Sequence, residues 1–152
     1  MPSRQCSCGS GSFSFALISG RTILLFMKVV VIGVGQVGSS VAHALAEEHE
    51  VIAVDKDPDR LEMIRAETDV LTHEGNGARV EVLKSAEVQD ADLVIGSTSD
   101  DRSNILICST ARALNESAFT IARVAETEYL ATWSQLREAF NVDFMVGADH
   151  LT

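Results

Sequence analysis

The chain has 152 residues, enough for one domain with a sizeable hydrophobic core and hardly enough for a second. It is acidic, with 22 Asp and Glu residues against 12 Lys and Arg residues and a formal net charge of -10. Binding to nucleic acid phosphates needs clustered Lys and Arg, so this composition argues against a nucleic acid partner.

The first 26 residues differ in composition from the rest of the chain. They contain no Asp or Glu, are rich in Ser and Gly, and end in an apolar run that Arg21 interrupts. The run is too short to span a membrane, and no small-residue cleavage pattern precedes Lys28, which argues against a signal peptide. We expect residues 1–26 to be a disordered or mis-assigned N-terminal extension and residues 27–152 to form the functional domain.

From Lys28 onward, β-branched runs alternate with amphipathic segments. The first run, KVVVIG, is apolar on both faces, which is typical of a central parallel strand. The predicted strands cover residues 28–33, 50–55, 69–75, 91–98, 118–124 and 142–147. The predicted helices cover residues 36–48, 58–67, 78–86, 102–114 and 126–140. Asp57 and Pro58 suit the N-cap and first position of the second helix, and Asp100 or Asp101 can cap the fourth.

Six strands joined by helical connections predict an α/β fold, because parallel strands need right-handed crossovers that cover both faces of the sheet. We therefore expect a doubly wound parallel sheet of about six strands, the Rossmann architecture of NAD(P)-binding domains.

A glycine motif follows the first predicted strand. Gly33, Gly35 and Gly38 form G-x-G-x-x-G at the start of the first predicted helix. In this motif the glycines allow a tight turn, close approach of a pyrophosphate and close packing of helix on strand. The N-terminus of the helix adds free N–H groups and a partial positive charge. The segment therefore predicts a dinucleotide site.

Asp55 ends the second predicted strand, 22 positions after Gly33. A carboxylate there accepts hydrogen bonds from ribose hydroxyls and repels a 2′-phosphate, which favours NAD-type or adenosine ligands over NADP. Lys56 weakens this exclusion. The alternative is that Asp55 is only a turn carboxylate at the end of a strand.

The ends of the other predicted strands should meet at the same edge of the sheet. Asn76 and Gly77 lie in the small-residue segment after the third strand, and we expect an adenine ring to lie there. Thr98 and Ser99 follow the fourth strand and are candidates to contact ribose or pyrophosphate, and Arg123 ends the fifth and is placed to face the phosphates. The alternatives are ordinary turn chemistry for the loop residues and, for Arg123, an ion pair with Glu126 or Asp101.

Candidates for catalysis are poor. No histidine is paired with a recognisable acid in a loop that would cover a nicotinamide ring, and neither H-x-x-x-H nor C-x-x-C occurs; the four are His43, His49, His73 and His150. Cys108 lies in an apolar helical stripe and is expected in the core. The three cysteines form no disulfide framework, which favours a reducing, cytoplasmic setting. We therefore expect no enzyme, no catalytic residue and no metal.

The segments MKVVVIGVGQVG, VIAVD, EGNGA, ADLVIGSTSDDRSN and IARV together resemble the N-terminal domain of the TrkA/KtrA regulatory subunits of potassium transporters. The resemblance covers residues 27 to about 150, and this domain is also called RCK-N or KTN. It implies a cytoplasmic nucleotide sensor at the inner face of the membrane that binds NAD(H), ATP or ADP, assembles as a homodimer or larger ring, and gates a TrkH/KtrB-like membrane subunit. The binding positions that it implies are Gly33, Val34, Gly35, Gln36, Val37, Asp55, Thr98, Ser99 and Arg123.

Three departures from the family pattern refine this expectation. Gln36 stands where ATP-sensing members commonly carry Arg, which favours the NAD-binding, TrkA-like branch, and Ala78 replaces a frequent Ser or Thr. The chain stops at Thr152, where full-length relatives continue into a second domain, so we expect either a fragment or a partner that supplies a C-terminal RCK domain. The alternatives to a sensor are an NAD-dependent oxidoreductase or its isolated cofactor-binding domain, and an interaction module with an empty crevice.

Overall fold

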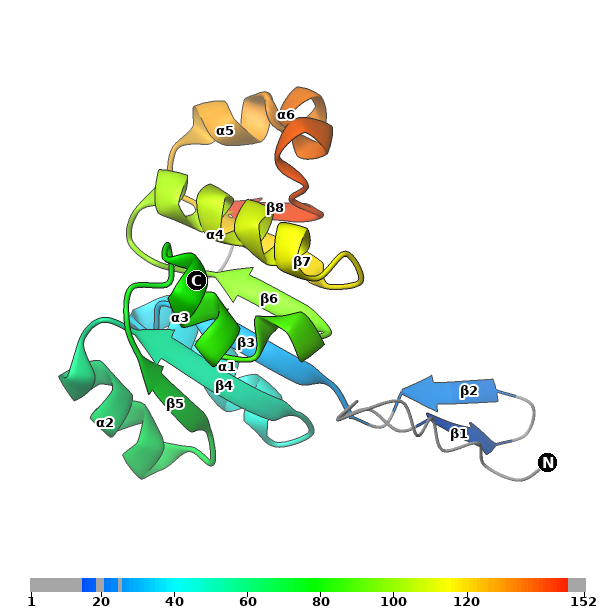
Figure 1. Cartoon of the computed structure of the whole chain (residues 1–152), viewed down its shortest axis with the longest axis vertical. Helices are drawn as coiled ribbons and strands as arrows, with labels where there is room; N and C mark the ends of the chain where they lie inside the picture. The colour runs from blue at the N-terminus through cyan, green and yellow to red at the C-terminus, as the bar shows by residue number, and fades with distance from the viewer. Residues whose placement is uncertain (1–14, 19–20, 25, 148–152) are drawn as a thin grey trace.

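The computed structural model describes residues 15–18, 21–24 and 26–147. Six strands form one parallel sheet in the order β5-β4-β3-β6-β7-β8, seen at the centre of Figure 1. The strands are β3 (Lys28–Ile32), β4 (Glu50–Asp55), β5 (Leu71–Glu74), β6 (Leu93–Gly96), β7 (Phe119–Val124) and β8 (Phe144–Gly147). The predicted doubly wound α/β fold is confirmed.

The connections between these strands are helical. The helices are α1 (Gln36–Ala46), α2 (Pro58–Glu67), α3 (Val80–Ser85), α4 (Asp101–Leu114), α5 (Thr127–Ala131) and α6 (Trp133–Phe140), with a short 3-10 helix at Val88–Asp90. The 3-10 helix is not predicted from the sequence. In the described part of the chain, no helix combines the length and apolar character needed to cross a membrane.

β3 lies in the middle of the core. Its five residues are all buried, and alternate side chains serve two layers. Val29 and Val31 pack in the cluster that includes residues of α1 and α2, whereas Val30 and Ile32 pack in the cluster that includes residues of α3 and α4. This alternation explains why the strand is apolar on both faces.

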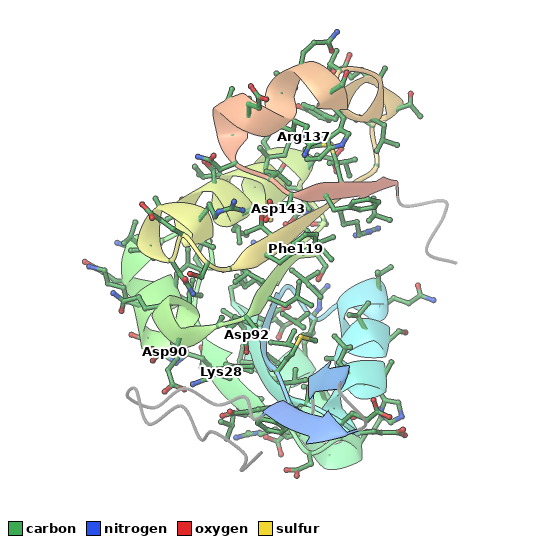
Figure 2. All side chains as sticks on the ribbon, turned by 90° about the vertical axis from the view of Figure 1, so that its right-hand side faces the viewer. Lys28, Asp90, Asp92, Phe119, Arg137 and Asp143 are labelled. Carbon is green, nitrogen blue, oxygen red and sulfur yellow. The ribbon has the colours of Figure 1, made fainter. Side chains whose placement is uncertain are left out.

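The amino ends of three strands are tied together by Asp92, which precedes β6 (Figure 2). Its Oδ2 accepts a hydrogen bond from the Lys28 N–H at 2.8 Å, and its carbonyl accepts one from the Phe119 N–H at 3.0 Å. These bonds fix β3, β6 and β7 at the edge opposite to their carboxyl ends.

The strand order reverses between β3 and β6, and such a switch point is where open α/β sheets bind ligands.

The predicted helix over residues 126–140 is wrong in its continuity, because the structure divides it into α5 and α6 at Thr132. The Thr132 hydroxyl donates to the Glu128 carbonyl at 2.9 Å. Such a bond from a β-branched residue back to the preceding turn bends helices. Figure 1 shows the two short helices beside β8.

Two further strands precede the sheet and are not predicted from the sequence. β1 (Phe15–Ile18) and β2 (Arg21–Leu24) pair in antiparallel fashion as a separate two-stranded sheet. The described residues do not include 1–14, 19–20, 25 and 148–152, and so they do not include Cys6, Cys8 and His150. The interpretation of residues 1–26 as an extension to a domain at 27–152 stays a prediction.

Candidate functional site

A cavity of about 380 Å³ opens at the carboxyl ends of the central strands. Most of the residues that the sequence predicts for a nucleotide site line it, namely Gly33, Gly35, Gln36, Val37, Asp55, Lys56, Asn76, Gly77, Thr98, Ser99 and Arg123. Val34 and Gly38, which were also predicted, are not part of this lining. The sheet therefore brings residues from the carboxyl ends of five strands into one crevice.

The three motif glycines meet different surroundings. Gly33 has a φ of +91°, and a Cβ there would lie 2.7 Å from the Thr98 nitrogen. A Cβ on Gly38 would lie 1.8 Å from the Gly33 carbonyl oxygen, so this position packs helix on strand. At Gly35 the nearest atom to a Cβ is 3.7 Å away, on Arg60. The backbone at Gly35 is therefore the open part of the loop, where a phosphate can approach.

Asp55 is almost fully buried, with 6% of its surface exposed, and both of its carboxylate oxygens accept backbone hydrogen bonds. Oδ2 accepts from the Val34 N–H at 2.8 Å, and Oδ1 accepts from the Asp57 N–H at 2.9 Å. Val34 therefore serves the site through its backbone, because its N–H links the glycine loop to the end of β4. Each oxygen keeps a second lone pair that can accept from a ribose hydroxyl.

Arg60 is a lining residue that the sequence does not single out. Its guanidinium lies 3.8 Å from Asp55 and 3.7 Å from Asp57, and it also lines a second cavity of about 390 Å³ between α1 and α2. Arg60 lies in the first turn of α2, which begins at the carboxyl edge of the sheet. This position in the sequence could have indicated Arg60 as a site residue, since a long side chain in the first turn of α2 reaches the crevice.

The loop after β6 is held by a closed set of hydrogen bonds between Thr98 and Asn104. The Thr98 N–H and hydroxyl both donate to Asn104 Oδ1, at 2.8 and 2.6 Å. Asn104 Nδ2 donates to the carbonyl oxygens of Thr98 at 3.0 Å and Arg123 at 2.7 Å. The Thr98 hydroxyl thus serves the turn, as the alternative interpretation allows, whereas Ser99 lines the cavity beside it.

The two acids before this asparagine have separate tasks. Asp100 caps α4 by accepting from the N–H and hydroxyl of Ser103, and these hydrogen bonds lower the pKa of its carboxyl. Asp101 accepts from the N–H groups of Ala125 and Glu126, both at 2.8 Å. The segment from Thr98 to Asn104 therefore ties the loop after β6 to the loop after β7.

The Arg123 side chain lines the cavity, and no acidic side chain of the described residues forms an ion pair with it. The alternative of an ion pair with Glu126 or Asp101 is wrong, because the ion pairs of the described chain do not include Arg123 and both Asp101 oxygens accept from backbone N–H groups. One guanidinium nitrogen donates to the Thr98 carbonyl at 3.3 Å, whereas Nε is buried and has no hydrogen-bond partner. A buried, unsatisfied donor on a cation is an incomplete arrangement that an anionic ligand would complete.

The segment after β5 presents backbone to the cavity. Asn76 Oδ1 accepts from the Ala78 N–H at 3.0 Å, which is an ordinary Asx turn. A Cβ on Gly77 would lie 2.2 Å from Ile32 Cγ2, so glycine is needed for the loop to lie against β3. Ile32 and Gly77 both line the cavity, and an apolar side chain next to a glycine suits the adenine ring that the sequence predicts here.

The histidines and the cysteine considered as catalytic candidates make contacts that serve the fold. His43 Nδ1 is hydrogen-bonded to Thr68 at 2.7 Å, and His49 Nδ1 accepts from the Met27 N–H at 3.1 Å. Cys108 is fully buried, and burial raises the pKa of its thiol to about 12. Within the described residues, no three His, Cys, Asp or Glu side chains are grouped as a metal site would require.

Comparison with known families gives a match over most of the chain. A family model described as the TrkA-N domain matches residues 29–146. A Trk system potassium uptake protein trkA homolog of Methanosarcina mazei is 39% identical over 126 residues, which are 79% of this chain and 30% of that protein. The Trk system potassium uptake protein TrkA of Halomonas elongata is 35% identical over 127 residues, which are 82% of this chain and 28% of that protein. The chain spans less than a third of the length of these relatives.

Solved structures share the fold at lower identity. The TrkA-N domain of the inner membrane protein ybaL from Escherichia coli has a TM-score of 0.69 at 22% identity, covering 82% of this chain and 88% of that one. The GsuK channel bound to NAD has a TM-score of 0.65 at 19% identity, covering 79% and 21%. The AMP-bound Kef CTD of Shewanella denitrificans has a TM-score of 0.64 at 20% identity, covering 81% and 74%.

Proposed function

The chain belongs to the TrkA-N domain family, and we propose that it is the nucleotide-sensing regulatory part of a potassium uptake system. The ligand is NAD(H), with ATP and ADP as the alternatives, bound in the cavity at the carboxyl ends of β3, β4, β6 and β7. The names of the relatives support the link to potassium uptake. The NAD-bound channel and the AMP-bound Kef structure are examples of this fold holding adenine nucleotides.

The observation that carries the proposal is the guanidinium of Arg123, which has a buried Nε without a partner and lines the same cavity as the open backbone of Gly35. A pyrophosphate placed between them receives the charge of Arg123 on one side. On the other side it receives the N–H groups at the start of α1, whose first turn contains no acid. Asp55 and Gly77 then meet the adenosine half.

The site is shared by the two halves of the sheet, and this supports sensing. The glycine loop and Asp55 come from the β3-β4-β5 half, whereas Thr98 and Ser99 follow β6 and Arg123 lies at the end of β7. A ligand that contacts both halves stabilises the arrangement in which they fit it best, and differential affinity is all that a switch requires. No proton donor or acceptor enters this mechanism, so the proposed function is not enzymatic.

The partners follow from the same proposal. A homodimer or larger ring of this domain, with a C-terminal RCK domain in the same or another chain, acts on a TrkH/KtrB-like membrane subunit. Its place is then the cytoplasm, at the inner face of the membrane. Ligand binding changes the relative positions of domains in the assembly, and the transporter subunit responds to that change.

The test is ligand binding by the full 152-residue chain. NAD, NADH, ATP and ADP are each titrated while thermal unfolding is followed, and a ligand at a hundredfold excess over its Kd should stabilise the protein by about 2.7 kcal/mol. Arg123→Ala should weaken the binding about 10- to 100-fold, because a hydrogen bond to a charged group is lost. Arg137→Ala is the control, since that guanidinium lies over Trp133 on α6.

Three results would decide against the proposal. If none of the four nucleotides raises the Tm, the sensor function is wrong. If Arg123→Ala binds as tightly as Arg137→Ala, phosphate recognition by Arg123 is wrong. Turnover of NADH in the presence of a set of small carbonyl and hydroxy acid substrates would instead favour an oxidoreductase.

A further inference from the structure

We propose that Asn104 is the positioning residue of this site, in that it holds the end of β7, which carries Arg123, at the distance from the loop of Thr98 at which the guanidinium meets a phosphate. The inference rests on the proposed nucleotide site and adds a residue that does not line the cavity.

Asn104 is wholly buried, with 0% of its surface exposed, in the first turn of α4. Its side chain makes four hydrogen bonds, two accepted by Oδ1 from Thr98 and two donated by Nδ2 to the carbonyl oxygens of Thr98 and Arg123. The amide has two donors and two acceptor lone pairs, so its capacity is used completely. No spare polar group is left for a ligand, which gives Asn104 an indirect role.

The hydrogen bonds of Asn104 lie just beyond the point where β6 and β7 stop pairing with each other. The ladder between β6 and β7 ends with the pair Gly96 and Ala122, one residue before Arg123. Beyond that pair, the Asn104 amide bridges the carbonyl oxygens of Thr98 and Arg123. Gly96 allows α4 to come this close, since a Cβ there would lie 3.0 Å from the Asn104 carbonyl oxygen.

Positioning matters for Arg123 because no carboxylate of the described residues orients it. Its guanidinium has one weak bond, to the Thr98 carbonyl at 3.3 Å, and that carbonyl also accepts from Asn104. A long side chain loses rotamer entropy when it binds a phosphate. Asn104 fixes the backbone of both Thr98 and Arg123. The Arg123 side chain therefore loses less conformational entropy when a phosphate binds, and the affinity for the nucleotide is higher.

The same helix provides a matched control. Asn115 follows the last residue of α4, and its Nδ2 likewise donates to two backbone carbonyl oxygens, those of Val88 at 3.0 Å and Ala91 at 2.8 Å. These bonds lie at the end of α4 away from the cavity. Asn104→Ala and Asn115→Ala therefore remove the same kind of bond, and only the first touches the proposed site.

The experiment measures binding of NAD, ADP and adenosine to the full 152-residue chain by calorimetry, at a temperature where both variants are folded. We expect Asn104→Ala to weaken NAD or ADP binding about tenfold and adenosine binding less than about threefold, because adenosine has no phosphate for Arg123. Asn115→Ala should leave all affinities within about twofold. If Asn104→Ala does not fold, the pair Asn104→Ser and Asn115→Ser is compared in its place.

A double-mutant cycle separates positioning from a general loss of structure. In the Arg123→Ala background, Asn104→Ala should cause no further loss of NAD or ADP affinity, because the group through which Asn104 acts is gone. Additive losses would overturn the inference, and so would equal nucleotide affinities of Asn104→Ala and Asn115→Ala, while the proposed function would stand. If the unmodified chain binds none of NAD, NADH, ATP, ADP and adenosine, both are overturned.

Discussion

The carboxylate of Asp55 accepts a hydrogen bond from the backbone N–H of Val34 at 2.8 Å, and so joins the end of β4 to the glycine loop. The residue predicted to recognise ribose therefore also holds the glycine loop in shape. A loss of nucleotide affinity on removing this carboxylate combines both effects. The stability of the ligand-free protein separates them.

Asp55→Ala should lower the free energy of unfolding of the ligand-free protein by about 1–3 kcal/mol, because the buried N–H of Val34 and the partly buried N–H of Asp57 lose their acceptor. Urea denaturation measures this change. Asp59→Ala, an exposed acid in the first turn of α2, is the control and should change stability by less than about 1 kcal/mol. Equal stabilities of the two variants would show that the bond does not support the loop.

The glycines of the motif should separate folding from binding. Gly38→Ala places a methyl group 1.8 Å from the Gly33 carbonyl oxygen, so we expect a loss of more than about 3 kcal/mol or no folded protein. Gly35→Ala meets nothing closer than 3.7 Å and should fold with nearly unchanged stability. It should still weaken nucleotide binding, because the methyl group occupies the approach of the phosphate. Circular dichroism and calorimetry on both variants check this, and tight binding by Gly35→Ala would contradict the placement of the phosphate.

Cys108 should resist alkylation in the folded protein. Its thiol is fully buried and its pKa is raised to about 12, so almost no thiolate exists at pH 8. Iodoacetamide treatment followed by peptide mass mapping should show modification of Cys108 only after denaturation. Rapid modification under native conditions would mean that α4 opens easily from β7, to whose Ile121 carbonyl the thiol donates.

Asp143 should contribute stability that acid removes. Burial opposes its ionisation, but hydrogen bonds from Arg112 and Thr120 outweigh that effect and lower the pKa of its carboxyl from the ordinary value. Because the folded-state pKa is lower than the unfolded one, the contribution is complete above about pH 5 and is lost as pH falls below about 4. The unfolding free energies of the unmodified protein and Asp143→Asn should therefore differ at pH 6 by about 1–3 kcal/mol and converge at lower pH.

The pH series needs a control for general acid effects on so acidic a chain. Asp69→Asn removes an exposed carboxylate and should give a small difference that changes little with pH. If the Asp143→Asn difference did not shrink as the pH was lowered to the acid limit of folding, the ion pair with Arg112 would not be its cause.

The fold was predictable because its signals are local. Buried β-branched runs mark the strands, Asp57 and Pro58 mark the start of α2, and the glycines mark the turn after β3. The break at Thr132 was missed because the apolar spacing of a helix continues across it, whereas the bond to Glu128 depends on a single side chain. The strands β1 and β2 were missed because an apolar run with Ser and Gly was interpreted as an extension.

The candidate site was predictable as a set of loops but not as a set of interactions. The strand order brings Gly35, Asp55 and Arg123 to one edge, and this follows from topology alone. Asp101 binds Ala125 in the loop after β7, 24 positions away, and Asn104 binds Arg123 at the end of β7, 19 positions away. Nothing in the local sequence specifies such contacts, since they depend on how closely α4 packs on β6.

The position of β3 has a consequence for how the protein acquires its site. β3 is the first of the six sheet strands in the chain and also lies at the centre, so its amino end meets Asp92, which is 64 positions away. Pairing over such a separation is slow to form. The crevice at the switch point does not form until β6 has paired with β3. Before that, only the residues of the β3-β4-β5 half are in place to contact a nucleotide. Under the proposed function, the nucleotide therefore binds only chains whose sheet is complete, and it does not guide their folding.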